Sequence, residues 1–208
     1  MLENIGAFAL TALFITMVPG QGMAMVLRQA LVSGSTAARL SVLGNSSGLI
    51  IWTLASAVGL SAIFAASPIA FEILKWSGVV YLLFIAAQTL WSLRTSSHRF
   101  DFEGEEIQTP GHAFRVGFLT NITNAKAMLF ALAFLPQYVP ADFNLTLGVI
   151  IFGLIWTIIS VSWYMAIVAG INRAHAWLQK PRVRRGLTAV SGVGIFILAI
   201  GLVVTPAK

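Results

Sequence analysis

The chain of 208 residues contains no cysteine and little charge. Without cysteine there is no disulfide framework, no thiolate nucleophile and no cysteine metal site. Charged residues make up 10% of the chain, whereas a soluble domain of ordinary composition has about 25%. Hydrophobic residues make up 58% and the mean hydropathy is +0.87, so polar side chains are too few to cover a water-soluble fold. The composition therefore predicts an integral membrane protein surrounded by the lipid bilayer.

The long apolar segments also lack histidine, aspartate and glutamate in their interiors. The histidines His98, His112 and His175 lie between these segments, and Glu72 and Asp142 lie near segment ends. An intramembrane enzyme needs a nucleophile, a base or metal ligands at depth, so we expect no enzymatic activity, no cofactor and no metal site. The lack of deep oxygen anions and thiols also disfavours a metal ion as a transported solute.

A net charge of +6 results from 13 basic and 7 acidic residues. The basic residues lie between apolar runs and form no solvated patch beside a packed core, so nucleic acid is not an expected partner. The charges instead mark the ends of six apolar segments of about 20 residues, the length that crosses a bilayer. The expected spans are 4–27, 40–66, 73–93, 116–138, 145–171 and 186–204, which predicts an all-α fold of six transmembrane helices.

Basic residues are distributed unevenly between the two sides of these spans. The even-numbered connections and the termini carry only Lys75 and Lys208, and Lys126 lies within the fourth span. The positive-inside rule therefore places the odd-numbered connections in the cytoplasm and both termini outside, in a multi-pass protein of the inner (plasma) membrane. The ten basic residues of the odd-numbered connections are Arg28, Arg39, Arg94, Arg99, Arg115, Arg173, Lys180, Arg182, Arg184 and Arg185.

The third connection divides the single membrane domain into two halves of three spans. We interpret 1–93 as a first three-helix repeat, 94–113 as a cytoplasmic linker and 114–208 as a second repeat. Because each half has an odd number of spans, the two halves enter the membrane from opposite sides. Inverted repeats of this kind are common in secondary transporters, where the substrate site lies at the interface of the repeats.

Each half opens with a span that is interrupted at the same offset. Pro19 follows Phe8 by eleven residues, and Ala125, in the polar run 120–126, follows Phe114 by eleven residues. Interruptions at corresponding places in two inverted halves are the best pointer that a sequence gives to the binding site of a transporter.

The first interruption is the run Pro19-Gly20-Gln21-Gly22. Proline has no amide hydrogen and clashes with the preceding turn, which frees carbonyl groups near Phe14 and Ile15. Glycine relaxes the backbone, and freed backbone groups are tolerated in lipid only inside protein or beside a wet cavity. The run therefore indicates either a polar cavity or a kink that serves helix packing alone.

The second interruption contains Lys126 together with Asn121 and Asn124. At 1.5 Å per residue, Lys126 lies about 16 Å beyond Arg115, near the middle of a hydrocarbon core about 30 Å thick. A lysine at this depth costs roughly 2.5–3.5 kcal/mol, so such residues are usually kept for function. The alternatives are that Lys126 reaches toward cytoplasmic water or pairs with carbonyls at the first interruption.

Span two contributes Asn45, which either lines a cavity or bonds across helices. Its neighbours Gly44 and Gly48 are four residues apart, a spacing that favours close helix contact. Trp52, Trp156 and Trp163 are interpreted as packing or interface aromatics. The expected substrate-binding residues are Pro19, Gly20, Gln21, Gly22, Asn45, Asn121, Asn124 and Lys126.

Four segments together resemble the LysE/RhtB family of amino-acid exporters. They are Phe8 with Met17-Val18-Pro19-Gly20, then 74–83, 114–127 and 134–137, and the likeness covers nearly the whole chain. The resemblance implies a six-helix inner-membrane protein that exports amino acids or close derivatives as a homodimer, driven by the proton-motive force. The family usually has Pro-Gly-Pro in span one and Asn-Pro-Lys in span four, where this chain has Gln21 and Ala125.

The expected function is export by alternating access, in which one half rocks against the other around a central site. Lys126 would neutralise a substrate carboxylate, and the amides of Gln21, Asn45, Asn121 and Asn124 would receive the amino group. Neutral amino acids are favoured because no deep acidic residue offers a counter-charge, and Lys126 is a candidate carrier of the coupling proton. A non-transporting membrane scaffold and an exporter of a different small solute are the alternatives.

Overall fold

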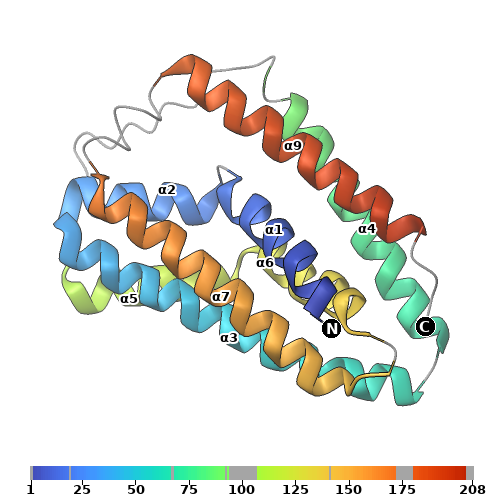
Figure 1. The fold of residues 1–208 in the computed structure, drawn as a ribbon. Helices are drawn as coiled ribbons and strands as arrows, with labels where there is room; N and C mark the ends of the chain where they lie inside the picture. The colour runs from blue at the N-terminus through green and yellow to red at the C-terminus, as the bar shows by residue number, and fades with distance from the viewer. Residues whose placement is uncertain are drawn as a thin grey trace.

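The computed structural model describes residues 2–18, 20–66, 68–91, 93, 107–140, 142–171 and 180–204. The described residues are almost entirely helical and contain no β-strand (Figure 1). Two helical runs, Gln21–Gly59 and Leu145–Ala169, are long and apolar enough to cross a membrane. Two shorter apolar helices, Asn4–Met17 and Arg185–Gly201, accompany them. The described residues thus confirm an all-helical fold with candidate membrane spans.

The first span is broken, as the sequence predicts. Helix α1 (Leu2–Met17) ends before the break, and α2 (Gln21–Arg28) follows it. A π-helical turn, η1 (Gln29–Ser33), leads into the long α3 (Gly34–Ala66). Gly34 has a φ of 87°, a backbone conformation that suits glycine because it has no Cβ, and the chain reverses direction there (Figure 1).

The second broken span bends by 54° between Ile122 and Ala125. Helix α5 (Pro110–Ile122) precedes the bend. After the bend, α6 (Ala125–Leu129) continues through a π-helical segment, η2 (Phe130–Phe134), and a 3₁₀ turn, η3 (Leu135–Tyr138). The remaining helices are α4 (Pro68–Trp91), α7 (Leu145–Ala169) and α9 (Pro181–Val204).

Four helices begin five or six residues before the spans expected from the sequence. These are α3 at Gly34, α4 at Pro68, α5 at Pro110 and α9 at Pro181. Charges mark the edge of the apolar run, but a helix continues through the polar interface as long as its backbone amides and carbonyls have hydrogen-bond partners. Proline suits the first helical position because that residue needs no amide hydrogen.

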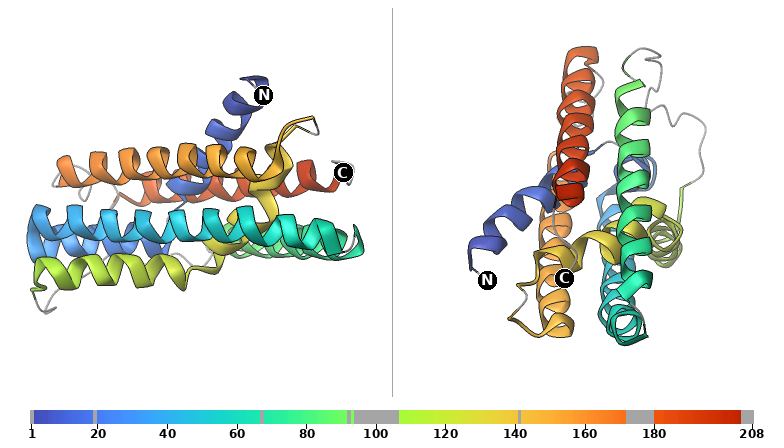
Figure 2. Two further views of the ribbon diagram at one scale, coloured as in Figure 1. Left: turned by 90° about the horizontal axis from the view of Figure 1, so that it is seen from below. Right: turned by 90° about the vertical axis from the view of Figure 1, so that its right-hand side faces the viewer.

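The helices pack in a connected arrangement in which α3 lies along both α5 and α7 (Figure 2). Helix α1 packs on α7 and α9, and α4 packs on α9. An aromatic cluster joins both broken spans to α7, since the ring centroids of Phe8 and Phe152 are 4.9 Å apart and those of Phe130 and Trp156 are 4.7 Å apart. The rings of Phe8 and Phe130 are themselves 6.1 Å apart, so the cluster packs α1 and η2 side by side against one face of α7.

Helices α3 and α5 touch backbone to backbone at two glycines. A Cβ on Gly44 would lie 2.9 Å from the backbone nitrogen of Phe118, and one on Gly117 would lie 2.7 Å from the carbonyl carbon of Ser41. Small residues allow such close approach in membrane helices. The predicted close contact at Gly44 is confirmed.

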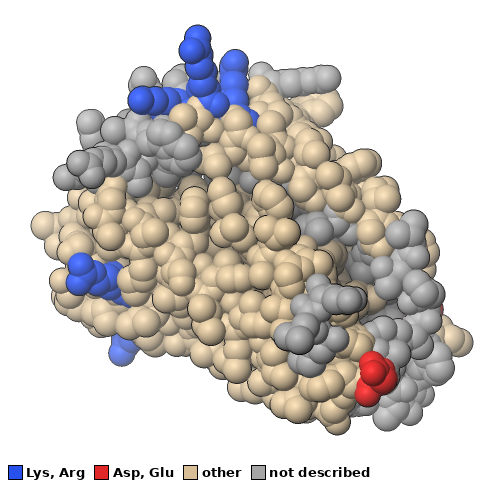
Figure 3. Space-filling view, viewed as in Figure 1, with Lys and Arg blue, Asp and Glu red and all other residues tan. Residues whose placement is uncertain are grey.

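Charged side chains gather toward the ends of the face seen in Figure 3. Lysine and arginine lie near the end where α2 stops and α9 begins, and an acidic side chain lies near the opposite end (Figure 3). Between them the described part of this face carries neither charge, as expected for a surface in contact with lipid.

Candidate substrate-binding site

The two breaks meet at Lys126. Its Nζ donates a hydrogen bond to the backbone carbonyl of Ile15, 3.1 Å away, and the side chain is partly buried. Ile15 is four residues before Pro19, so its carbonyl is the one that proline deprives of a helical partner. Of the alternatives left open by the sequence, the structure has Lys126 paired with a freed carbonyl of the first break.

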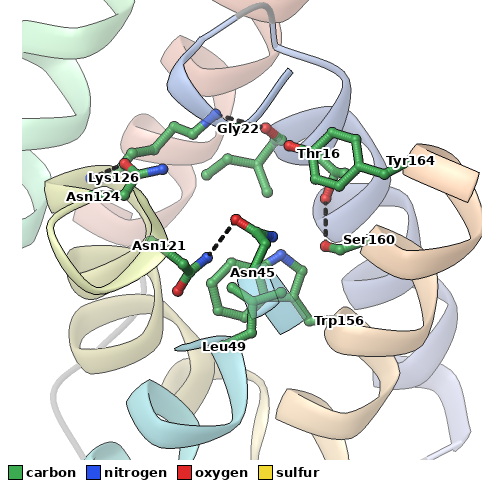
Figure 4. A pocket seen from close by; sticks show the side chains of 12 residues that line it. Thr16, Gly22, Asn45, Leu49, Asn121, Asn124, Lys126, Trp156, Ser160 and Tyr164 are labelled. Atoms are coloured by element: carbon green, nitrogen blue, oxygen red, sulfur yellow. Dashed lines mark hydrogen bonds between the residues drawn. The ribbon is translucent and has the colours of Figure 1, made fainter. Parts of the chain in front are cut away.

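Asn124 sets the geometry of the second break. It is the N-cap of α6, and its Oδ1 accepts a hydrogen bond of 3.0 Å from the backbone amide of Lys126. An asparagine cap satisfies a helix amide that would otherwise lack a partner. Because the cap holds Lys126 in the first turn of α6, the lysine side chain reaches back toward the break in the first span (Figure 4).

A pair of buried amides, Asn45 on α3 and Asn121 on α5, lies next to the lysine (Figure 4). Asn121 Nδ2 donates to Asn45 Oδ1 at 3.3 Å. Gly48 makes room for this pair, because a Cβ there would lie 2.7 Å from Asn121 Oδ1. That oxygen has no hydrogen-bond partner among the described residues, a deficit that costs about 1–3 kcal/mol in a buried site. The amide pair therefore retains hydrogen-bonding capacity.

These residues enclose a small cavity of about 30 Å³. The space suffices for one or two water molecules, and pockets that hold small ligands are roughly ten times larger. The cavity is therefore too small for an organic ligand unless the surrounding helices move. The lining residues are Ile15, Thr16, Gly22, Asn45, Leu49, Asn121, Asn124, Lys126, Ala127, Trp156, Ser160 and Tyr164 (Figure 4).

Five of the eight expected site residues line this cavity: Gly22, Asn45, Asn121, Asn124 and Lys126. Gly20 lies beside it, since a Cβ on Gly20 would be 3.9 Å from Lys126 Nζ. Gln21 is exposed and is not among the lining residues. Pro19 lies outside the described residues.

Sequence reasoning missed the wall of the cavity that comes from α1 and α7. Thr16, Ser160 and Tyr164 contribute hydroxyl groups, and Trp156 lines the cavity besides packing on Phe130. The only signal in the sequence is the spacing of Trp156, Ser160 and Tyr164, four residues apart in an apolar run, which places them on one helix face. That spacing alone does not reveal what the face meets.

A polar cavity enclosed by two broken apolar helices is typical of membrane transporters. Comparison with known families makes this assignment specific, because the family described as LysE type translocator matches residues 13–205. The chain belongs to this family. It is therefore a transporter and not an enzyme.

Relatives match along most of the chain. A homoserine/homoserine lactone efflux protein of Salmonella typhi is 27% identical over 202 residues, which cover 97% of this chain and 96% of that protein. The uncharacterized membrane protein YrhP of Bacillus subtilis (strain 168) is 25% identical over 202 residues, covering 92% and 94%. A leucine efflux protein of Salmonella choleraesuis (strain SC-B67) is 29% identical over 136 residues, covering 65% and 63%. No solved structure matches the chain significantly.

Proposed function

We propose that this transporter exports amino acids or close derivatives from the cytoplasm across the inner membrane. The observation that carries the proposal is the ammonium group of Lys126 at the meeting point of two broken helices, inside a polar cavity. The efflux functions named for two relatives support the same class of substrate.

The substrate carboxylate is proposed to bind between Lys126 and the first turn of α2. Gly20, the N-cap of α2, supplies no side-chain hydrogen bond, and the first amides of any helix have no partner within it. The positive end of the helix dipole and the lysine ammonium both favour an anion there. Gly20 lies next to Lys126 Nζ, so the two attractions act at one place.

The amino group is proposed to bind the amides of Asn45 and Asn121, which lie beside the lysine in the cavity (Figure 4). The lining residues include no aspartate or glutamate, which supports a preference for neutral over cationic amino acids. Lys126 is the one basic residue among those that line the cavity, and we assign the coupling proton of a proton-driven cycle to it.

Two inverted three-helix halves, 1–93 and 114–208 joined by the linker 94–113, are the proposed architecture. In this architecture α1 is equivalent to α5, α3 to α7 and α4 to α9. The helix contacts support it, because replacing each helix by its equivalent turns the contacting pair α3–α5 into α7–α1, which is also in contact. The same replacement turns the contacting pairs α3–α7 and α4–α9 into themselves. With odd-numbered connections in the cytoplasm, both termini lie outside. Association as a homodimer stays a prediction.

Alternating access is supported by two sets of hydrogen bonds, one on either side of the cavity. On the proposed cytoplasmic side, the first half bonds to the linker just before α5: the backbone amide of Gln108 donates to Ser33 Oγ at 2.9 Å, and the side-chain amides of Gln29 and Gln108 are 2.6 Å apart. On the outer side, Asn4 Nδ2 donates to the carbonyl of Tyr138 at 2.8 Å, and the hydroxyls of Thr11 and Tyr138 are 2.9 Å apart. We call these the inner and outer latches.

The proposed function is tested with the purified protein in liposomes loaded with labelled neutral amino acids. A pH gradient with the acidic side outside the liposomes is expected to drive saturable efflux, because a proton that enters in exchange for substrate supplies the energy. An efflux rate that does not depend on the pH gradient would contradict the proposed coupling to protons. Absence of flux with every amino acid and derivative tested would instead favour the scaffold.

The latches predict which side of the cavity opens in a variant. With Asn45→Cys as the reporter, Gln29→Ala combined with Ser33→Ala should raise its labelling by a cytoplasmic thiol reagent about 30-fold, since each of the two lost hydrogen bonds contributes about 1 kcal/mol. Asn4→Ala combined with Thr11→Val should raise labelling from outside. The chain has no cysteine of its own, so the reporter is free of background.

Ser47→Ala is the matched control for both latch variants, because Ser47 Oγ bonds to the carbonyl of Leu43 within α3 and joins no halves. Its labelling pattern should equal that of the reporter alone. Equal labelling of the latch variants and the control from both sides would contradict the role of the latches.

A further inference from the structure

One face of α7 forms a wall of the cavity that the proposed binding of the carboxylate and amino group leaves unused. Trp156, Ser160 and Tyr164 lie one turn apart on this face, and all three are buried (Figure 4). Ser160 is 3% exposed and Tyr164 is 7% exposed. Buried hydroxyls are normally hydrogen-bonded, so the partners of these two groups are informative.

Ser160 presents a hydrogen-bond acceptor to the cavity. Thr16 Oγ1 donates its only hydrogen to the carbonyl of Ala12 at 2.7 Å. In the contact of 3.1 Å between the hydroxyls of Thr16 and Ser160, the donor must therefore be Ser160. Its own hydrogen is used in this bond, and the lone pairs of Ser160 Oγ stay available to a ligand.

Tyr164 presents a donor. Its hydroxyl makes no hydrogen bond within the described part of the chain, although it lies deep between the helices. It lies against Gly22, where a Cβ would be 2.6 Å from the hydroxyl oxygen. The hydroxyl therefore faces the cavity with its hydrogen-bonding capacity unused, and a ligand in the cavity can supply the partner.

We propose that Ser160 and Tyr164 select the side chain of the substrate by binding its hydroxyl group. A group that donates to Ser160 and accepts from Tyr164 must both donate and accept, which a hydroxyl does and an alkyl group does not. Lys126 and Tyr164 reach the break from opposite sides (Figure 4), so a carboxylate at Lys126 leaves the side chain facing α7. Trp156 and Leu49 close the adjoining wall and limit the side chain to a short one.

This inference rests on the proposed export of amino acids, and its test uses pairs of substrates that differ only in the hydroxyl. Homoserine is compared with 2-aminobutyrate, and serine with alanine, by competition in the liposome assay. The unaltered protein is expected to prefer the hydroxyl compound at least about fivefold, the effect of one hydrogen bond. Tyr164→Phe and Ser160→Ala should each lower this ratio toward one, chiefly through the KM of the hydroxyl compound.

Thr157→Val is the matched control on α7. Thr157 is also buried, but its hydroxyl bonds to the carbonyl of Gly153 at 2.8 Å and does not line the cavity. This variant should keep the ratio of the unaltered protein. A ratio unchanged in correctly folded Tyr164→Phe and Ser160→Ala, as judged by size-exclusion elution, would overturn the inference while measurable flux upholds export. Absence of flux in the unaltered protein would overturn both.

Discussion

Lys126→Met is expected to abolish export and leave the protein folded in the membrane. The substrate carboxylate would lose its charged partner, and leaving one buried charge without its partner costs about 3–5 kcal/mol, which corresponds to a loss of at least about 100-fold in kcat/KM. Folding should not suffer, because a lysine within the bilayer costs roughly 2.5–3.5 kcal/mol and methionine removes that cost. Initial rates of efflux from liposomes measure the loss, and thermal unfolding in detergent measures the stability.

Lys180→Met is the matched control. Lys180 is exposed just before α9, and its substitution removes the same charge from the chain. Its rate should stay within twofold of the unaltered protein. If Lys126→Met retained full export of every substrate, the pairing of Lys126 with the carbonyl of Ile15 would be structural only, and the carboxylate site would have to lie elsewhere.

Gly117→Val is expected to separate α3 from α5 and to destabilise the protein more than any other single change proposed here. Two backbones meet at Gly117, and the β-branched side chain would occupy the space of the carbonyl group of Ser41. Overpacking of this kind costs about 1–3 kcal/mol when flexible side chains can yield, and the upper end or more is expected where the neighbour is backbone. Thermal unfolding of the detergent-purified protein, with yield from the membrane fraction, measures the effect.

Gly59→Val tests whether this loss comes from the contact or from glycine replacement in general. Gly59 lies on α3, and a Cβ there would meet no described atom within 4 Å. The control should be neutral or slightly stabilising, because valine restricts the unfolded chain more than glycine does. Equal destabilisation by both variants would mean that the contact between α3 and α5 adds nothing.

The meeting of the two breaks could be predicted because its chemistry is local. A proline frees the carbonyl four residues before it wherever it stands in a helix, and a lysine in lipid must find a polar partner. The sequence alone therefore narrowed the partner of Lys126 to water or the carbonyls near Ile15. It did not choose between them, since the choice depends on the bend of 54° that aims α6 at the first break.

The cavity wall that carries the hydroxyls of Thr16, Ser160 and Tyr164 could not be predicted, for a different reason. Serine and threonine in apolar helices usually bond to the carbonyl one turn before, and a residue of that kind carries no functional signal. Thr157 and Ser160 look alike in the sequence, yet Thr157 bonds within α7 and Ser160 bonds to Thr16 of another helix. Gln21 is the converse case, because its place beside Pro19 suggests the cavity, whereas the turn of α2 leaves its side chain exposed.

The glycine contact of α3 and α5 bears on how such a transporter moves. Gly44 and Gly117 fasten a helix of the first half to a helix of the second, and Gly153 packs on Thr53 to fasten α7 to the same scaffold. Interfaces as close as these slide only with a large loss of contact. Rocking of the two halves as rigid bodies would have to break these contacts. If the protein works by alternating access, we therefore expect the segments beyond the breaks, α1 and α6 through η3, to make the larger movement.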